Sequence, residues 1–209
     1  MTRRARAAAL PLLLMLPAAL AQAQPRPDAL AELQRGNYER AAEIGMGEIA
    51  AGGRGVDSYV ALCRALIALG RHEEALRFAN MARAANRHDP RVIGILGEIY
   101  FSMGNNAGAL RYFQHYLTVS PEGSRAHMAH YFVGEIFIRT GRFRRADIAL
   151  TAAVHMAPGN AEWWARLAFA RENAGDLAQA VAAYERALAL DPRLADARRG
   201  LDRVRAALR

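Results

Sequence analysis

The sequence predicts an all-α protein built from repeated helix pairs, on three observations. A glycine-to-alanine signature, Gly-x-x-x-x-Ala, recurs five times, and successive glycines are 34, 34, 37 and 34 residues apart. Each copy separates two apolar runs of helical period. Proline follows the second run in three of the copies. A period near 34 residues indicates a repeat array, in which each unit packs mainly on its neighbours.

The glycine and the alanine of the signature have different roles. Glycine adopts a left-handed backbone conformation easily, so it can end the first helix of a pair. Alanine is small at the point where the two antiparallel helices approach each other. The first helix of each full unit has its own small residue at the matching place: Cys63, Gly97, Gly134 and Ala168. We therefore expect closely packed helix pairs.

The runs beside each signature place the helices. Before the second glycine, Tyr59, Leu62 and Leu66 recur at helical spacing, as expected for one buried face. Prolines close the second helix of three units because proline cannot continue the intrahelical hydrogen-bond ladder. These prolines are Pro121, Pro158 and Pro192.

Together these features resemble the tetratricopeptide-repeat (TPR) family. Its units combine a Trp-x-x-Leu-Gly-x-x-Tyr stretch with a later alanine, an aromatic residue and a proline. The best match is Trp164, Leu167, Ala168, Ala180, Tyr184, Ala187 and Pro192. The resemblance covers the chain from about Asp28 onward. It implies a right-handed superhelical solenoid of about four and a half repeats plus a C-terminal capping helix.

The repeat spacing divides the chain. A truncated first unit spans 24–55, four units span 56–89, 90–123, 127–160 and 161–194, and a capping helix spans 195–209. The first unit ends in a glycine-rich break at 52–55, and three extra residues near 122–125 lengthen one turn. One stripe of the capping helix is apolar and would cover the last repeat. The stripe consists of Leu194, Ala197, Leu201, Val204 and Leu208.

Residues 1–23 have the pattern of a cleaved secretory signal peptide. Three arginines open the chain, an apolar run spans 7–20, and small residues precede a cleavage site after Ala23. That run is shorter than the roughly 20 residues of a membrane-spanning helix, and two prolines interrupt it. We therefore expect a periplasmic protein whose mature chain has no transmembrane segment.

Charge and cysteine content narrow the function further. The formal net charge of +8 falls to +5 without the three leader arginines, and all basic residues are arginine. An exported protein is not expected to bind nucleic acid. The single cysteine, Cys63, cannot form an internal disulfide. Because Cys63 takes the small packing place of its repeat, we expect a buried, inert thiol.

The sequence predicts neither an enzyme nor a metal or cofactor site. It contains no Gly-x-Ser-x-Gly, His-Glu-x-x-His, Cys-x-x-Cys or Gly-x-Gly-x-x-Gly motif. His127 and His130 have the spacing of a ligand pair, but no third ligand follows at regular spacing. Trp164 is predicted to be the core tryptophan of its repeat, which leaves Trp163 to point elsewhere as an exposed contact residue.

In the TPR family the first helix of each unit lines a concave face that holds a partner segment. Carried onto this sequence, that frame predicts a mixed aromatic and charged surface, which suits protein recognition. The predicted contact residues are Arg64, Arg91, Glu98, Phe101, Tyr131, Glu135, Arg139, Phe169 and Glu172. Alternatively, the aromatic residues simply pack on neighbouring helices. The carboxylate clamp of the cytosolic co-chaperones of this family is absent.

Two functions remain open from the sequence. The first is a periplasmic, non-catalytic scaffold that binds a partner protein during assembly of a cell-envelope complex, an inference by family analogy. The second is a module that binds an anionic envelope component, lipid or polysaccharide, through a basic patch of Arg142, Arg144 and Arg145. The sequence does not identify the partner, and it leaves self-association open.

Overall fold

A computed structural model describes residues 28–52 and 55–209. The predicted signal peptide and residues 53–54 of the glycine-rich break lie outside the described residues. Within the two described ranges the chain forms eleven α-helices and no strand, as expected for an all-α fold. In the same ranges no helix is long and apolar enough to cross a membrane.

The helices follow one another with short turns. They are α1 (Ala29–Gln34), α2 (Tyr38–Ala50), α3 (Val56–Ala68), α4 (His72–Ala85), α5 (Pro90–Ser102), α6 (Asn106–Val119), α7 (Ala126–Arg139), α8 (Phe143–Met156), α9 (Ala161–Ala174), α10 (Leu177–Leu190) and α11 (Ala195–Ala207).

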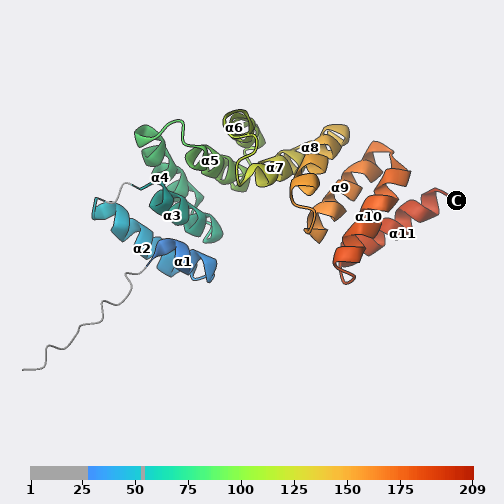
Figure 1. Ribbon diagram of the computed structural model, residues 1–209, viewed down its shortest axis with the longest axis horizontal. Helices are drawn as coiled ribbons and strands as arrows, with labels where there is room; N and C mark the ends of the chain where they lie inside the picture. Colours follow the sequence, from blue (N-terminus) through green and yellow to red (C-terminus); the bar gives the residue numbers. More distant parts are fainter. Residues whose placement is uncertain (1–27, 53–54) are drawn as a thin grey trace, which may run out of the picture.

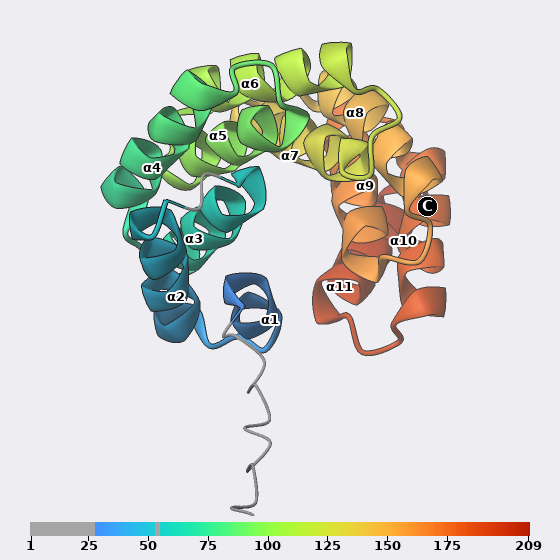
Figure 2. The same cartoon turned by 60° about the vertical axis from the view of Figure 1, so that its left-hand side comes forward.

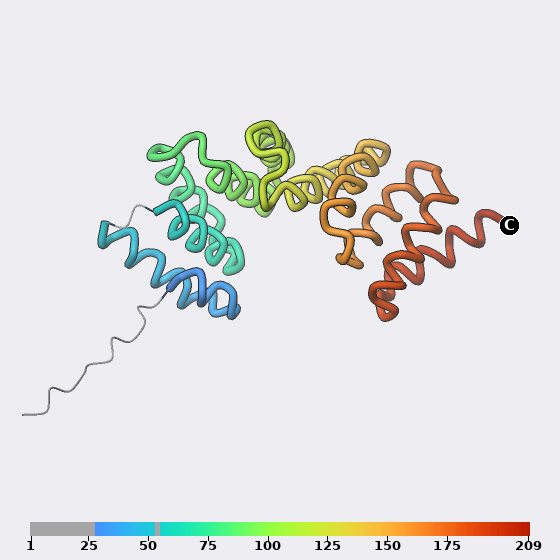
Figure 3. Tube along the Cα trace, viewed as in Figure 1, coloured from blue at the N-terminus to red at the C-terminus, as the bar shows by residue number. Residues whose placement is uncertain are grey.

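The helices form an arch of two rows. Figure 2 shows the odd-numbered helices along the inner side and the even-numbered helices along the outer side. Consecutive helices pack as antiparallel pairs, which can be followed along the tube in Figure 3 and by colour in Figure 1. Each inner helix from α3 onward also contacts the next inner helix. This arrangement confirms the predicted solenoid of helix pairs.

The signature glycines end the first helix of every pair, as predicted. All five have positive φ, between 69° at Gly141 and 89° at Gly175. The residue after each glycine donates its backbone N–H to a carbonyl five residues earlier. In the second repeat, for example, Arg71 N lies 2.8 Å from Leu66 O. This bond satisfies a free carbonyl at the helix end, and it recurs in all five copies.

The small residues of the first helices are buried where the paired helices approach. Cys63 and Ala168 have no exposed surface, and Gly97 and Gly134 are also buried. A Cβ atom on Gly97 would lie 2.7 Å from the ring of Phe113 on α6, so only glycine fits there. The close approach of α5 and α6 therefore depends on this position.

The thiol of Cys63 belongs to this packing. Its Sγ donates a hydrogen bond to the carbonyl oxygen of Ala75 on the paired helix, over 3.4 Å. Burial, with a smaller contribution from Glu98, raises the pKa of the Cys63 thiol to about 12. A thiol that stays protonated is a poor nucleophile, in agreement with the expected structural role.

The C-terminal helix α11 agrees with most of its predicted apolar stripe. α11 buries Ala197, Leu201 and Val204 against the last repeat, as its apolar stripe predicted. Leu208, which belongs to the same predicted stripe, is 55% exposed because the helix ends at Ala207.

The lengthened turn before α7 does not break the array, because Arg125 at its end donates to Glu98 on α5 over 2.9 Å.

Glycine at position 97 is expected to be required for stability. We predict that Gly97→Ala lowers the free energy of unfolding by about 1–2 kcal/mol, because overpacking costs more than the gain in helix propensity. Gly47 on α2 is the control, since a Cβ atom added there would meet nothing within 4 Å. Gly47→Ala should stabilise the protein by about 0.5–1 kcal/mol. Urea unfolding measures both, and equal effects would contradict the packing account.

Candidate functional site

The inner helices are joined by ion pairs from one repeat to the next. Glu135 on α7 accepts two hydrogen bonds from Arg166 on α9, at 2.6 and 2.8 Å. Glu172 on α9 accepts two from Arg203 on α11, both at 2.9 Å. A similar link joins α3 to α5, where Arg91 donates to Asp57 over 2.7 Å. These contacts form an ion-pair ladder along the inner surface.

Five of the nine predicted contact residues are part of this ladder: Arg64, Arg91, Glu98, Glu135 and Glu172. Glu98 illustrates the effect, because it faces Arg64 at 3.4 Å as well as Arg125. Glu135 is only 8% exposed, and both of its oxygens are engaged by Arg166. These charges connect repeats, so a partner would meet a surface whose charges are largely neutralised.

The predicted aromatic contact residues pack between repeats and remain half-buried. Tyr131 stacks on Trp163 of the next inner helix, with ring centres 4.8 Å apart. Phe101 lies under the guanidinium of Arg139, at 3.7 Å from the ring centre. Phe169 meets Phe143 edge-on at 6.3 Å. Each of these rings thus has one face on a neighbour while part of it stays accessible on the inner surface.

The prediction for Trp163 was wrong. Trp163 is buried, with 6% exposure, because the flat ring of Tyr131 on the previous repeat covers it. Trp164 is partly exposed, and its Nε1 donates to the carbonyl oxygen of Pro158 over 2.9 Å. The stacking partner lies on another repeat, so the spacing within one repeat could not reveal it.

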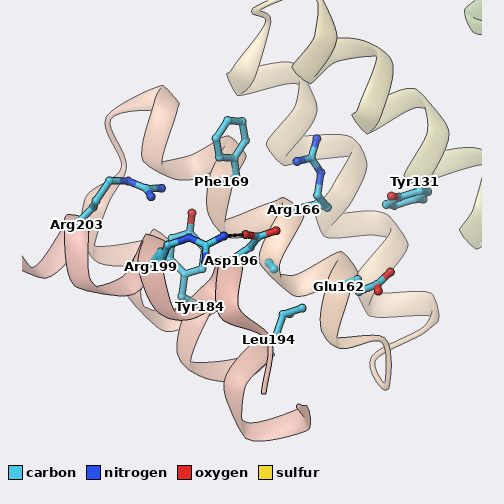
Figure 4. A pocket seen from close by; sticks show the side chains of 10 residues that line it. Tyr131, Glu162, Arg166, Phe169, Tyr184, Leu194, Asp196, Arg199 and Arg203 are labelled. Atoms are coloured by element: carbon cyan, nitrogen blue, oxygen red, sulfur yellow. Dashed lines mark hydrogen bonds and ion pairs between the residues drawn. The ribbon is translucent and has the colours of Figure 1, made fainter. Parts of the chain in front are cut away.

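A cavity of about 410 Å³ lies at the C-terminal end of the inner row. Its apolar surface comes from Ala165 and Phe169 on α9 and from Leu194 before α11. Figure 4 shows Tyr131 and Glu162 on one side and residues of α10 and α11 on the other. We call this cavity the C-terminal pocket. Its remaining lining residues are Arg166, Tyr184, Asp196, Arg199 and Arg203. The volume suits a large side chain or a small ligand.

Most polar groups of the C-terminal pocket are already engaged. Tyr184 donates its hydroxyl to Glu172 over 2.6 Å. Burial, and then this hydrogen bond, raises the pKa of Tyr184 above its ordinary range. Burial alone would raise the pKa of Glu172, but the hydrogen bonds from Arg203 and Tyr184 outweigh it and lower that pKa. Glu162 is exposed, and it has no ion pair among the contacts of the described residues.

The pocket was only partly predicted from the sequence. Tyr131 and Phe169 were expected on the concave face, and the structure brings both to this cavity. Leu194 and Arg199 were missed because α11 was given only a covering role. The available signal was the spacing of Glu172 and Arg203, 31 residues apart, which equals that of Glu135 and Arg166. That repetition extends the inner surface onto α11.

The two histidines singled out from the sequence lie apart from the pocket. His127 packs against Trp163, with ring centres 5.7 Å apart. Burial lowers the pKa of both His127 and His130, with a further contribution from Arg125 for His127. Across residues 28–52 and 55–209, no group of three or more metal-ligating side chains is placed to hold an ion.

The predicted basic patch lies on the outer row, at the start of α8. Arg142, Arg144 and Arg145 are all exposed. No carboxylate of the described residues lies within ion-pair distance of them, and only Arg145 has an aromatic neighbour, Phe137, at 6.0 Å. An apolar groove adjoins Arg145, and Ile148 on its edge is 73% exposed. One cation of the basic patch, Arg145, therefore borders an exposed apolar surface.

Comparison with known proteins supports the repeat assignment. The family model described as the cilia and flagella-associated protein 70 C-terminal domain matches residues 14–198. A search of curated proteins found no significant match.

Solved structures of repeat proteins have the same fold. MamA from Desulfovibrio magneticus RS-1 has 23% identity and a TM-score of 0.66, over 73% of this chain and 84% of that one. A thermophilic TPR protein from Thermus thermophilus has 21% identity and a TM-score of 0.66, over 86% and 95%. YrrB, described as a TPR protein with an unusual peptide-binding site, has 20% identity and a TM-score of 0.68, over 79% and 84%. At these identities the likeness concerns the fold alone.

The Glu172 network is expected to make the C-terminal end sensitive to acid. The pKa of the Glu172 carboxyl in the folded protein lies below the ordinary value of 4.5, so the network stabilises the folded state fully above about pH 5. That stabilisation is lost as the pH falls through the lowered pKa. We predict that Glu172→Gln costs about 1 kcal/mol at pH 7, after allowance for the half-exposed Arg203, and much less at pH 3.

The exposed Glu185–Arg205 pair also links α10 to α11 and provides the control. Glu185→Gln should change the free energy of unfolding by only a few tenths of a kcal/mol. Urea unfolding at both pH values measures the two variants. An effect of Glu172→Gln that does not depend on pH would contradict the assigned network.

Proposed function

Because this chain belongs to the tetratricopeptide-repeat family, we propose that it is a non-catalytic scaffold that holds a segment of a partner protein along its inner surface. The observation that carries the proposal is the C-terminal pocket. It combines an open cavity of about 410 Å³ with apolar surface from Ala165, Phe169 and Leu194. Such a cavity can take up an anchoring side chain, the kind of contact that dominates protein interfaces.

The charge distribution restricts how the partner would be recognised. Most carboxylates and guanidinium groups of the inner helices are engaged by the ion-pair ladder, so they add little new charge pairing. Recognition would instead use the accessible parts of Phe101, Tyr131 and Phe169 together with the exposed carboxylate of Glu162. We therefore expect a partner segment with an apolar anchor and a nearby basic residue. The peptide-binding site named for the similar YrrB is consistent with this use of the fold.

The compartment is proposed from the leader composition. Cleavage after Ala23 and export to the periplasm would place the scaffold beside cell-envelope complexes, where it would help their assembly. We expect the chain recovered from cells to begin at Gln24, which mass spectrometry of the intact protein would measure. We also expect it to be recovered in the periplasmic fraction. Recovery of the uncleaved chain in the cytoplasm would contradict this part of the proposal.

A second candidate function rests on the basic patch. Arg142, Arg144 and Arg145 have no carboxylate partner in the described part of the chain, and Arg145 lines the apolar groove that Ile148 borders. A surface of this kind can bind an anionic lipid or polysaccharide. Added salt distinguishes the two candidates, because attraction between exposed charges weakens with ionic strength, whereas burial of an apolar anchoring side chain largely survives.

The pocket proposal is tested by filling the cavity. Affinity capture from the envelope fraction should recover a partner with the wild-type protein. We expect Ala165→Gln to weaken the affinity for that partner about tenfold, a free-energy change of about 1.4 kcal/mol, and so to reduce the amount captured. Ala182→Gln, on the exposed side of α10, changes the same chemistry away from the pocket and should retain the partner. A partner that survives Ala165→Gln but is lost with Arg142→Gln/Arg144→Gln/Arg145→Gln would favour the second candidate.

A further inference from the structure

A second groove, on the outer part of the arch, is lined by basic groups. It lies between α4 and α6, near the turn that leads into α5, and its volume is about 390 Å³. Arg83 comes from the last turn of α4, Arg87 and His88 from the following turn, and Tyr112 and His115 from α6. Ala84 and Ile93 complete the lining, so none of the described carboxylates lines the groove.

The basic groups of this groove have few partners within the protein. Arg83 donates to the hydroxyl oxygen of Tyr112 over 2.6 Å, a neutral acceptor. No ion pair joins Arg83 or Arg87 to a carboxylate of the described residues. The nearest acid in the sequence, Asp89, is held by Arg91 in a hydrogen bond of 2.6 Å. In the C-terminal pocket, by contrast, Arg166 and Arg203 are each paired with a glutamate.

The groove combines three kinds of hydrogen-bond donor: guanidinium groups, imidazole groups and the hydroxyl of Tyr112. Tyr112 is 8% exposed, and its ring stacks on Tyr100 with centres 5.4 Å apart, so its hydroxyl is held in place. Because that oxygen accepts from Arg83, its hydrogen remains available to donate. Arg111 lies against the same ring, at 5.3 Å from its centre, and adds a further positive charge. A fixed hydroxyl thus lies among exposed guanidinium and imidazole groups.

Helix α4 accounts for only part of this charge. A cation in the last turn interacts favourably with the negative end of the helix dipole, which explains one basic residue at the position of Arg83. It does not explain the additional basic groups that reach the groove from the turn and from α6. Guanidinium groups present several parallel N–H donors, a geometry that matches the oxygens of a phosphate group.

We propose that this groove binds a phosphate group, carried by a small phosphorylated molecule or by a lipid headgroup. Arg83, Arg87 and the Tyr112 hydroxyl would donate to the phosphate oxygens, while His88 and His115 would flank it. The groove lies on the outer side of the arch, away from the C-terminal pocket, so a phosphate ligand and a partner segment could bind together. The proposal is independent of the scaffold function.

The test uses calorimetric titration of the protein with inorganic phosphate and with pyrophosphate, and sedimentation with phosphatidylglycerol or phosphatidylcholine vesicles. We expect saturable binding of the free phosphates, of the phosphatidylglycerol vesicles, or of both, which identifies the source of the phosphate. Arg83→Gln/Arg87→Gln should weaken that binding about tenfold. Arg186→Gln/Arg209→Gln removes the same charge from exposed positions outside the groove and outside the basic patch, and should leave it nearly unchanged.

Folding is checked by thermal unfolding of each variant, and Arg87→Gln/His115→Gln provides a second groove variant that keeps the Arg83–Tyr112 hydrogen bond. This variant should also weaken binding. Equal losses in the groove and control variants would mean general charge attraction and would overturn the proposal. The absence of binding to every probe up to about 10 mM phosphate would overturn it as well.

Discussion

The close approach of the two helices in each pair is the constraint on which the rest of the structure depends. At Gly97 the missing side chain lets the ring of Phe113 lie against α5. That ring stacks on Phe132 at 4.9 Å, which in turn packs on Phe101 at 4.8 Å. Phe101 then supports Arg139 on the inner surface. A small residue inside one helix pair thereby fixes the side chains that a partner would meet.

A second level of order joins the pairs to one another. The ion-pair ladder uses Glu98, Glu135 and Glu172, each partly buried between successive inner helices. Removing one member of such a pair leaves a charge without its partner, which usually costs more than the pair contributes. The ladder therefore helps to hold the repeats in register along the inner row. It also neutralises most of the inner surface, so the accessible apolar groups of the pocket at its C-terminal end lie among charges that are mostly paired.

The repeat fold was predictable because its determinants lie within single repeats. The left-handed glycines, the small packing residues and Cys63 all behave as their spacing indicated. Contacts between repeats were harder to predict. The burial of Trp163 under Tyr131, and the engagement of Glu135 by Arg166, depend on residues about one repeat away. The pocket also needed α11, whose docking angle no local pattern specifies.

The most direct test of the scaffold account is site-specific photocrosslinking in cells. A photoreactive residue at Glu162, on the rim of the C-terminal pocket, is compared with one at Gln179, which is exposed on α10. The account predicts a discrete protein crosslink from position 162 and none from position 179. A partner crosslinked from position 179 alone would place binding on the outer row and contradict the account.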